Sequence, residues 1–301
     1  MNKLLIICGA TATGKTKLAI DCAKKLNTEI ISADSQLIYK NLNIGTAKPT
    51  YEEMSGIPHH MIDVVEPDCS FSVSDYCRLA DPILVRLLSE KKVPVICGGT
   101  GFYINSLIYD LSYGSTAANQ AVRDKYNALL QEKGRDYLYN YLKSIDPQTA
   151  VKLHANDTKR VIRALEIYEV SGRRKSEIKD KQVPKYEYTA IAVDYPRDEL
   201  YERINRRVDE MFESGLVEEV KELVKKGITG EHQCMQAIGY KEVLECIKNG
   251  DNESTMRDII KQNTRHYAKR QITFFKKLEG LVWLEPEEAT PEKVLELFNG
   301  Q

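Results

Sequence analysis

The sequence predicts an α/β protein of the P-loop NTPase type, with a parallel sheet flanked by helices and an inserted all-helical domain. Three observations support this fold class. Short apolar segments alternate with helical ones along most of the chain, as in parallel sheets whose crossovers are helices. The first apolar segment leads into GATATGKT at 9–16, which has the spacing of a phosphate-binding loop. Residues 112–186 instead contain few β-branched runs and several turn signals, which predicts a helical insertion.

Two strands and one helix are predicted near the N-terminus. The run KLLIIC at 3–8 is short and almost entirely apolar, which is typical of a strand buried in a parallel sheet. After the phosphate-binding loop, Lys15–Leu26 is expected to form a helix that has an apolar side. The segment TEIISADSQ predicts a second strand, and this strand should end at Asp34.

Three further strands complete the predicted sheet. Val93–Cys97 is an apolar run that leads into the sequence GGTG, and the segments 188–196 and 281–286 have the same strand-like character. Functional residues of such sheets gather at the carboxyl ends of the strands. We therefore expect the phosphate-binding loop, Asp34 and the GGTG sequence to lie together.

The change of pattern within the chain sets the predicted domain boundaries. Residues 1–111 and 187–301 are expected to form a P-loop-type catalytic core with C-terminal helices. Residues 112–186 are expected to form the helical insertion domain. A large insertion in a nucleotide-binding fold usually serves as a lid or holds the substrate.

Composition limits the class of protein. The 301 residues are 42% hydrophobic and 29% charged with a net charge of −1, as in ordinary globular proteins, so any nucleic-acid-binding surface must be a local patch. The seven cysteines contain no C-x-x-C pair, which argues against a structural zinc site and favours a reducing cytoplasm. No segment approaches transmembrane length. We therefore expect a cytoplasmic protein without membrane contact.

The phosphate-binding loop is the strongest chemical signal. The backbone N–H groups of residues 10–16 can converge on phosphate oxygens at a helix N-terminus. Lys15 would reach the outer phosphate, and the Thr16 hydroxyl would bind Mg²⁺. The strand before the loop and the helix after it argue against a chance glycine-rich turn.

Asp34 and the GGTG sequence at 98–101 each allow several interpretations. The carboxylate of Asp34 could ligate magnesium, act as a base or cap the following helix. The glycines could let the backbone approach a ligand closely, or they could simply form a turn. A typical Walker B strand ends in Asp, whereas this strand ends in Gly-Gly-Thr. The phosphates therefore need not be those of ATP.

Two basic segments suggest nucleic-acid binding. Residues 158–181 contain eight Lys or Arg against four acids, and residues 257–277 contain seven against one. In the second segment Ile260, Tyr267 and Phe274 predict a core-facing stripe with the basic residues opposite. A solvated helix face explains such charges as well as phosphate-backbone binding does.

The adjacent pair His59-His60 is expected to have a structural or hydrogen-bonding role. Neighbouring side chains point in different directions in most backbones, so a metal shared by the two is not expected.

Taken together, the motifs resemble those of the tRNA dimethylallyltransferases, also called tRNA isopentenyltransferases or the IPP transferase family, and in particular the bacterial enzymes. The similar segments occur in the family's order and cover nearly the whole chain. They are GATATGKT (9–16), ADS (33–35), NIGTAKP (43–49), PHHMIDVVEP (58–67), GGTGFYI (98–104), HANDTKRVIRALEIYEVSG (154–172), RINRRVDEM (203–211), QAIGYKE (236–242) and TRHYAKRQITFF (264–275).

The resemblance implies a prenyl transfer. The family moves a dimethylallyl group from dimethylallyl diphosphate to N6 of an adenosine beside the anticodon of tRNA, and Mg²⁺ assists. By this resemblance Asp34 is the base, Thr100 orients the amine and Lys15 stabilises the leaving diphosphate. The diphosphate-binding residues would be Gly9, Ala10, Thr11, Ala12, Thr13, Gly14, Lys15 and Thr16, together with Arg203 or Arg207.

The resemblance also implies a monomer whose helical insertion binds the anticodon arm of tRNA. It assigns tRNA contacts to Asp34, Ser35, Gln36, Leu37, Thr100, Arg123, Lys159, Arg160, Arg163, Gln236, Ala237, Ile238, Gly239, Tyr240, Lys241, Lys269, Arg270, Gln271 and Thr273. One departure concerns RNA recognition. The family usually reads D-S-x-Q-x-Y, whereas here the glutamine comes one residue early, at Gln36, and Leu37 takes its place.

Three alternatives stay open from the residues alone. A small-molecule kinase would share the phosphate-binding loop but would leave PHHMIDVVEP and GGTG without a role. A cytokinin-type isopentenyltransferase acting on free adenine nucleotides would not need the basic segments. A non-catalytic RNA-binding protein would not need Lys15, Asp34 and Thr100 together.

Overall fold

The computed structural model describes residues 3–109, 119–178 and 183–300. Its contacts divide the chain into two compact units, which we call the core unit (Met1–Ile108 with Lys185–Gln301) and the insertion unit (Tyr109–Pro184). The predicted boundary after residue 111 lies outside the described residues. The predicted boundary after residue 186 lies two residues beyond the observed one.

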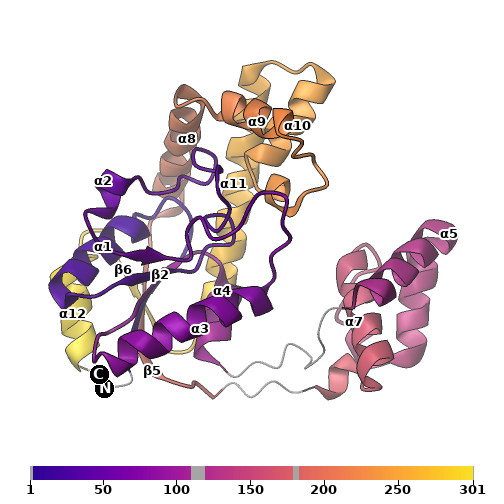
Figure 1. The fold of residues 1–301 in the computed structure, drawn as a ribbon, viewed down its shortest axis with the longest axis horizontal. Helices are drawn as coiled ribbons and strands as arrows, with labels where there is room; N and C mark the ends of the chain where they lie inside the picture. Colours follow the sequence, from indigo (N-terminus) through magenta and orange to yellow (C-terminus); the bar gives the residue numbers. More distant parts are fainter. Residues whose placement is uncertain (1–2, 110–118, 179–182, 301) are drawn as a thin grey trace. The chain divides into compact units, whose positions relative to one another are not determined.

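The described part of the core unit contains a parallel sheet, as the sequence predicted (Figure 1). Its six strands have the order β3-β2-β4-β1-β5-β6, and every pairing is parallel. The strands are β1 (Lys3–Cys8), β2 (Ile30–Ser32), β3 (His59–His60), β4 (Val95–Gly98), β5 (Glu187–Val193) and β6 (Leu281–Leu284). The sequence did not predict β3, because two residues are too few to show a periodic pattern. The prediction that the second strand ends at Asp34 was wrong by two residues.

Helices connect and flank these strands. The first helix begins at Lys15 and ends at Leu26, as predicted. A capping box starts α3, in which Ser72 accepts from the backbone N–H of Asp75 and Asp75 accepts from that of Ser72. The helices of the core unit are α1 (Lys15–Leu26), α2 (Tyr51–Met54), α3 (Val73–Ser89), α4 (Gly101–Ile108), α8 (Arg197–Glu213), α9 (Leu216–Lys225), α10 (Tyr240–Asn249), α11 (Glu253–Phe275) and α12 (Pro291–Gly300), with a 3-10 turn η2 (Gln233–Gln236).

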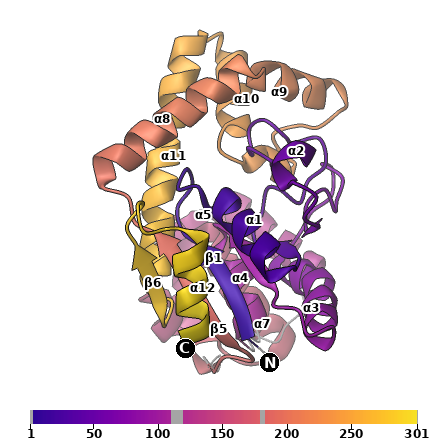
Figure 2. The same cartoon turned by 90° about the vertical axis from the view of Figure 1, so that its left-hand side faces the viewer.

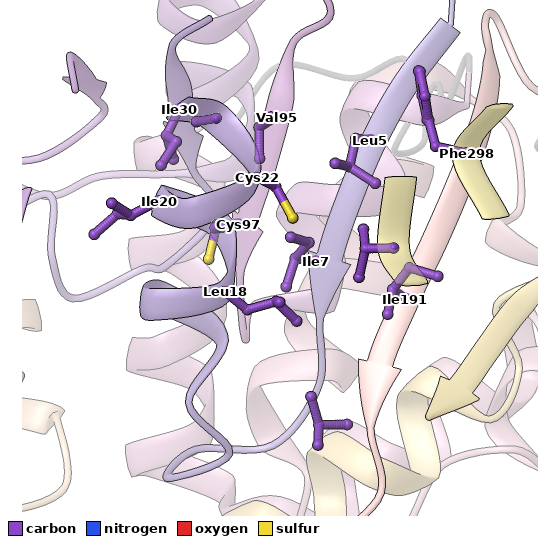
Figure 3. Packing of buried hydrophobic residues seen from close by; sticks show 14 of the residues in the cluster. Leu5, Ile7, Leu18, Ile20, Cys22, Ile30, Val95, Cys97, Ile191 and Phe298 are labelled. Carbon is purple, nitrogen blue, oxygen red and sulfur yellow. The ribbon is translucent and has the colours of Figure 1, made fainter. Parts of the chain in front are cut away.

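The main apolar core lies between the sheet and the helices α1 and α12. Figure 3 shows Leu5 and Ile7 of β1 among side chains of α1, with Phe298 of α12 beside them. Both faces of β1 are buried, which explains its continuous apolar run. Each fully buried large apolar side chain contributes about 1.5–3 kcal/mol. This core holds the start of α1, and therefore the phosphate-binding loop, in place.

Helix α11 corrects one sequence prediction. Its buried side chains are Met256, Ile260, Ala268, Gln271 and Phe275, whereas Tyr267 and Phe274 are only partly buried. The basic face opposite is not simply solvated, because α11 packs against α8, which crosses it (Figure 2). Lys261 Nζ lies 2.7 Å from Asp209 Oδ1, and Arg265 donates to Asn205 Oδ1 at 2.7 Å. These two charges stabilise a helix pair.

The described part of the insertion unit is mainly helical, with α5 (Gln120–Ile145), α6 (Pro147–Ala150), α7 (Thr158–Ser171) and the 3-10 turn η1 (Lys175–Glu177). Gly134 interrupts α5 with φ of 80°, a conformation that glycine adopts without strain. Tyr126 and Leu138 of α5 pack against Val161 and Leu165 of α7. No helix among the described residues of either unit is long and apolar enough to cross a membrane.

Candidate active site

The three predicted segments meet at the carboxyl edge of the sheet. Strands β2, β4 and β1 are neighbours, so the segments that follow them share one edge. Ala33 N donates to Cys97 O at 2.7 Å, and Thr100 N donates to Ala33 O at 3.0 Å. A Cβ at Gly98 would lie 2.1 Å from Ala33 O, so only glycine permits this approach. The GGTG glycines therefore bring the Asp34 turn and the β4 turn together.

The lysine of the phosphate-binding loop donates a hydrogen bond to the backbone of the same loop. Gly9, Ala12 and Gly14 have positive φ values of 123°, 63° and 79°, which gives the loop its concave backbone. Lys15 Nζ donates to Ala10 O at 2.7 Å. Burial lowers the pKa of Lys15, and the nearby Cys97 and Asp34 oppose this effect. The ammonium is thus held at the loop by a neutral acceptor.

Gln271 joins the loop to α11 and to the end of β4. Its Oε1 accepts from Thr11 N at 2.9 Å, and its Nε2 donates to Gly99 O at 3.0 Å. The residue is 6% exposed. Both polar atoms of the amide therefore make hydrogen bonds within the protein, and Gln271 positions the phosphate-binding loop. The residue also lines the cavity, and its expected contact with tRNA stays a prediction.

The structure separates the two candidate arginines of α8. Arg203 Nε donates to Ala12 O at 2.8 Å, and its guanidinium lies 4.4 Å from the ring centre of Tyr195. Arg207 lines the site cavity with Lys15 and Asp34. Burial lowers the pKa of Arg207, and the negative charge of Asp34 opposes the shift. Arg203 thus supports the loop from outside, whereas Arg207 faces the space that the loop borders.

Asp34 lies in a turn that fixes its orientation. Its Oδ1 accepts from Gln36 N at 2.8 Å, and Thr100 Oγ1 accepts from Ser35 N at 3.0 Å. The helix-capping interpretation of Asp34 was wrong, because no helix follows it directly; one carboxylate oxygen instead holds the turn after β2. A carboxylate has further lone pairs, so the bond to Gln36 leaves room for another interaction.

Tyr267 is a site residue that the sequence interpretation missed. It was expected to face the core, but it lines the same cavity as Asp34 and Gln271. Burial, followed by the charge of Asp34, raises the pKa of Tyr267 to about 12. The spacing of Tyr267 and Gln271, one helical turn apart on α11, was the only available sequence signal.

One cavity of about 360 Å³ collects most of the predicted residues of the core unit, a size that suits a small ligand. Its predicted lining residues are Thr11, Lys15, Thr16, Asp34, Ser35, Gln36, Leu37, Arg207, Gln236, Ala237, Ile238, Arg270 and Gln271. Both residues of the shifted glutamine motif, Gln36 and Leu37, line it. The predicted residues that do not line it are Gly9, Ala10, Ala12, Thr13, Gly14, Thr100, Arg203, Gly239, Tyr240, Lys241, Lys269 and Thr273.

Tyr240 is buried rather than presented to a ligand. It is 0% exposed, and its hydroxyl donates to Glu219. Burial, with Glu219 as the next cause, raises its pKa well above the ordinary value. A direct contact of this side chain with tRNA is therefore not supported. Lys269 and Thr273 are exposed on α11 and remain available for such a contact.

The predicted residues of the insertion unit differ in their surroundings. Arg123 Nε and Arg163 Nη1 lie 2.9 and 2.7 Å from the carboxylate of Glu166, which is 0% exposed. Arg160 is 69% exposed and pairs with Asp157 at 3.1 Å. The first two arginines stabilise this unit, whereas Arg160 presents most of its side chain to solvent.

The histidine pair has the hydrogen-bonding role that was predicted. His59 Nδ1 bonds to Ile57 O at 2.7 Å, and His60 Nε2 lies 2.6 Å from Glu29 Oε2. Among the residues that the structure describes, no group of three or more His, Cys, Asp or Glu side chains could hold a metal ion.

Comparisons with known families and with known proteins all point to isopentenyl transferases. Residues 37–278 match the family described as IPP transferase, and residues 2–67 match the family described as isopentenyl transferase. The tRNA dimethylallyltransferase of Acetivibrio thermocellus is 46% identical over 299 residues, which are 98% of this chain and 96% of that protein. The enzyme of the same name from Alkaliphilus oremlandii is 46% identical over 284 residues, 94% of this chain and 91% of that protein.

Solved structures give the same result. The tRNA isopentenylpyrophosphate transferase of Bacillus halodurans is 40% identical with a TM-score of 0.74, covering 100% of this chain and 95% of that one. A eukaryotic dimethylallyltransferase captured while acting on tRNA is 30% identical with a TM-score of 0.82, covering 96% of this chain and 74% of that one.

Proposed function

We propose a reaction for this chain from the premise that it belongs to the IPP transferase family, whose bacterial members are tRNA dimethylallyltransferases. It transfers the dimethylallyl group of dimethylallyl diphosphate to N6 of the adenosine beside the anticodon of tRNA. The carbon–oxygen bond to the diphosphate breaks, a carbon–nitrogen bond forms, and the amine loses one proton. The products are N6-isopentenyladenosine in tRNA and diphosphate.

One observation carries this proposal: a single cavity is lined by a phosphate-binding loop, three basic side chains and a carboxylate. The loop supplies Lys15, α8 supplies Arg207, α11 supplies Arg270, and the turn after β2 supplies Asp34. A diphosphate bound at the loop would lie close to a base. A phosphoryl-transfer enzyme would share the loop, but the family membership favours prenyl transfer.

Asp34 acts as the base in this mechanism. An exocyclic adenine amine is a weak nucleophile because its lone pair is delocalised into the ring. A positioned carboxylate that takes the proton as the carbon–nitrogen bond forms relieves this barrier. The bond from Gln36 N holds the Asp34 carboxylate in one orientation. Thr100 holds Ser35 of the same turn, and its expected hydrogen bond to the amine stays a prediction.

Positive groups stabilise the leaving diphosphate. Negative charge grows on its oxygen as the carbon–oxygen bond breaks, and fixed N–H donors and cations stabilise that charge in the transition state. Lys15, Arg207 and the loop N–H groups fill this role. Backbone carbonyls hold both side chains beside the cavity, because Lys15 donates to Ala10 O at 2.7 Å and Arg207 donates to Thr46 O at 3.4 Å.

We also propose that Mg²⁺ binds with the diphosphate at Thr16. Thr16 is exposed and lines the cavity, and Mg²⁺ commonly takes one or two protein ligands, with substrate phosphates and water completing its coordination. Such a coordination sphere does not require several carboxylates, so it is compatible with a site in which Thr16 is the protein ligand. The cation would add charge stabilisation to the leaving group.

The RNA partner is the anticodon arm of tRNA. The target base must leave its stack to reach a cavity of this kind. Exposed basic side chains in each unit, such as Arg160 and Lys269, would contact the phosphate backbone. We expect the protein to act as a monomer in the cytoplasm.

The test uses labelled dimethylallyl diphosphate, unmodified tRNA and Mg²⁺. Label should enter the tRNA with the wild-type protein, and Asp34→Ala should lower the rate about 100-fold or more, because general base catalysis contributes 10²–10⁴-fold. Asp258→Asn, an exposed carboxylate on α11, is the matched control and should keep full activity. Omitting Mg²⁺ should also lower the rate.

The same assay separates the alternatives. Label in free AMP rather than tRNA would indicate a cytokinin-type enzyme. Phosphoryl transfer from ATP without prenylated tRNA would indicate a kinase. Tight tRNA binding without any transfer would indicate a non-catalytic RNA-binding protein.

A further inference from the structure

A carboxylate outside the cavity holds one of its walls. Glu219 lies in the first turn of α9 and accepts hydrogen bonds from three consecutive backbone N–H groups. Asn43 N and Ile44 N each lie 2.9 Å from Oε2, and Gly45 N lies 3.2 Å from Oε1. The Tyr240 hydroxyl donates to Oε1 as well. We call this arrangement the Glu219 clasp.

The segment held by the clasp borders the cavity. Gly45, Thr46 and Ala47 line it, whereas Glu219 does not. Thr46 O accepts from Arg207 Nη2 at 3.4 Å. Glu219 is therefore connected to the cavity arginine through two consecutive residues of one loop.

Close packing leaves this loop little freedom to shift. A Cβ at Gly45 would lie 2.5 Å from Tyr240 Cε2 and 2.9 Å from Leu216 Cδ1. Tyr240 is 0% exposed and Leu216 is also 0% exposed. The loop thus rests on buried side chains of α9 and α10 while Glu219 binds its N–H groups.

Charge explains why the clasp needs a carboxylate. Three N–H groups that point at one place form an anion-binding concavity, and a charged acceptor makes stronger hydrogen bonds than a neutral one. A glutamine would keep one acceptor oxygen but would direct an NH₂ group at the other donors. The carboxylate of Glu219, which binds the start of the NIGTAKP motif, lies 174 to 176 positions further along the chain.

We propose that Glu219 is a positioning residue for the diphosphate site: its carboxylate fixes the 43–46 loop, and the Thr46 carbonyl thereby orients the Arg207 guanidinium. This inference rests on the proposed function, because it takes the diphosphate to be the ligand of Arg207. Glu219 itself does not touch the substrate.

The expected effect is on diphosphate binding. Glu219→Gln should weaken the binding of inorganic diphosphate with Mg²⁺, measured calorimetrically, by about 10-fold, because displacements near 1 Å at a reacting site cost up to about 100-fold. The KM for dimethylallyl diphosphate should rise by a similar factor. Glu218→Gln is the matched control, since Glu218 shares the first turn of α9 but has a 71% exposed side chain. It should behave as the wild type.

A double-mutant cycle with Arg207→Ala tests the route of the effect. If Glu219 acts through Arg207, then Glu219→Gln should change diphosphate affinity by less than about 2-fold once Arg207 is absent. An equal loss in both backgrounds, or no loss in the wild-type background, would overturn the inference. Should Glu219→Gln fail to fold, Tyr240→Phe removes one donor of the clasp and should show a smaller loss with the same dependence on Arg207.

Failure of the proposed function would be visible separately. A wild-type protein that binds diphosphate but prenylates no tRNA would contradict the proposed reaction. The affinity cycle would still decide whether Glu219 acts through Arg207.

Discussion

In the core unit, Lys15 and Arg207 donate hydrogen bonds to main-chain carbonyls, whereas in the insertion unit Arg123 and Arg163 donate to the buried carboxylate of Glu166. All four side chains are basic, and the sequence interpretation assigned ligand binding to all of them. A carbonyl is neutral, so it fixes a cation and leaves its full charge for a ligand. A carboxylate fixes the cation and cancels that charge.

This difference separates binding cations from structural ones. Among the described residues, Lys15, Arg203 and Arg207 form no ion pair, while Lys261 of α11 pairs with Asp209. A count of basic residues along the chain therefore overstates the charge available to RNA. The following predictions test whether removing a cation from each region changes chemistry or stability.

The largest effect is expected at Arg207. Arg207→Ala should lower kcat/KM for dimethylallyl diphosphate by about 10²–10³-fold, because it removes a fixed cation from the leaving group. Steady-state kinetics with saturating tRNA measures this change, and the thermal unfolding midpoint should stay close to that of the wild type.

Two neighbours on α8 sharpen this prediction. Arg206→Ala, an exposed residue, is the control and should have no effect. Arg203→Ala should cost less than Arg207→Ala, because Arg203 supports the loop only through Ala12 O. The comparison fails if Arg203→Ala is the more damaging change.

An intermediate effect is expected at Glu166, and it should concern stability. Glu166→Gln removes the charge that Arg123 and Arg163 share, and the N–H of Asn119 loses a charged acceptor. Breaking a buried pair is costly, but the two arginines are partly exposed and can regain water, so we expect about 2 kcal/mol. Hydrogen exchange of α5 and α7 measures this loss.

Glu132→Gln, an exposed residue on α5, is the control for this change and should leave exchange unaltered. Transfer activity at saturating tRNA should fall far less in Glu166→Gln than in Arg207→Ala. A loss of chemistry without a loss of stability would show that the insertion-unit arginines are not structural.

The smallest effect is expected at Glu29, another carboxylate that neutralises the charge of neighbouring basic side chains. Its hydrogen bonds from Arg86, and then from His60 and Lys92, lower its pKa from 4.5 to about 2. A carboxylate with a lowered pKa stabilises the fold fully above pH 4.5, and this stabilisation is lost as the pH falls from 4.5 to 2. Solvent screening of the partly exposed Arg86 and Lys92 limits it to about 1–2 kcal/mol.

Urea unfolding between pH 2 and 6 measures this contribution. The free energy of unfolding should fall less steeply with decreasing pH in Glu29→Gln than in the wild type, because the variant lacks the titrating group. Parallel curves for the two proteins would contradict the assignment.

Sequence patterns predicted much of the fold and part of the site. The five longer strands, the bounds of α1 and the meeting of the loop with Asp34 follow from local apolar runs and from the geometry of parallel sheets. The pattern could not reveal β3, because its two residues are a strand only through their pairing with β2. It also placed Tyr267 in the core, since periodicity does not distinguish a core from the wall of a cavity.

Local spacing and the order of the motifs were enough to predict the phosphate-binding loop, the position of Asp34 after its strand and the family. The folded arrangement was needed to show that Arg207 rather than Arg203 faces the cavity and that Gln271 holds the loop. Gln271 and Thr11 are 260 positions apart, and Arg207 and Thr46 are 161 apart. Such partners are chosen by packing between helices and the sheet edge, which local spacing does not encode.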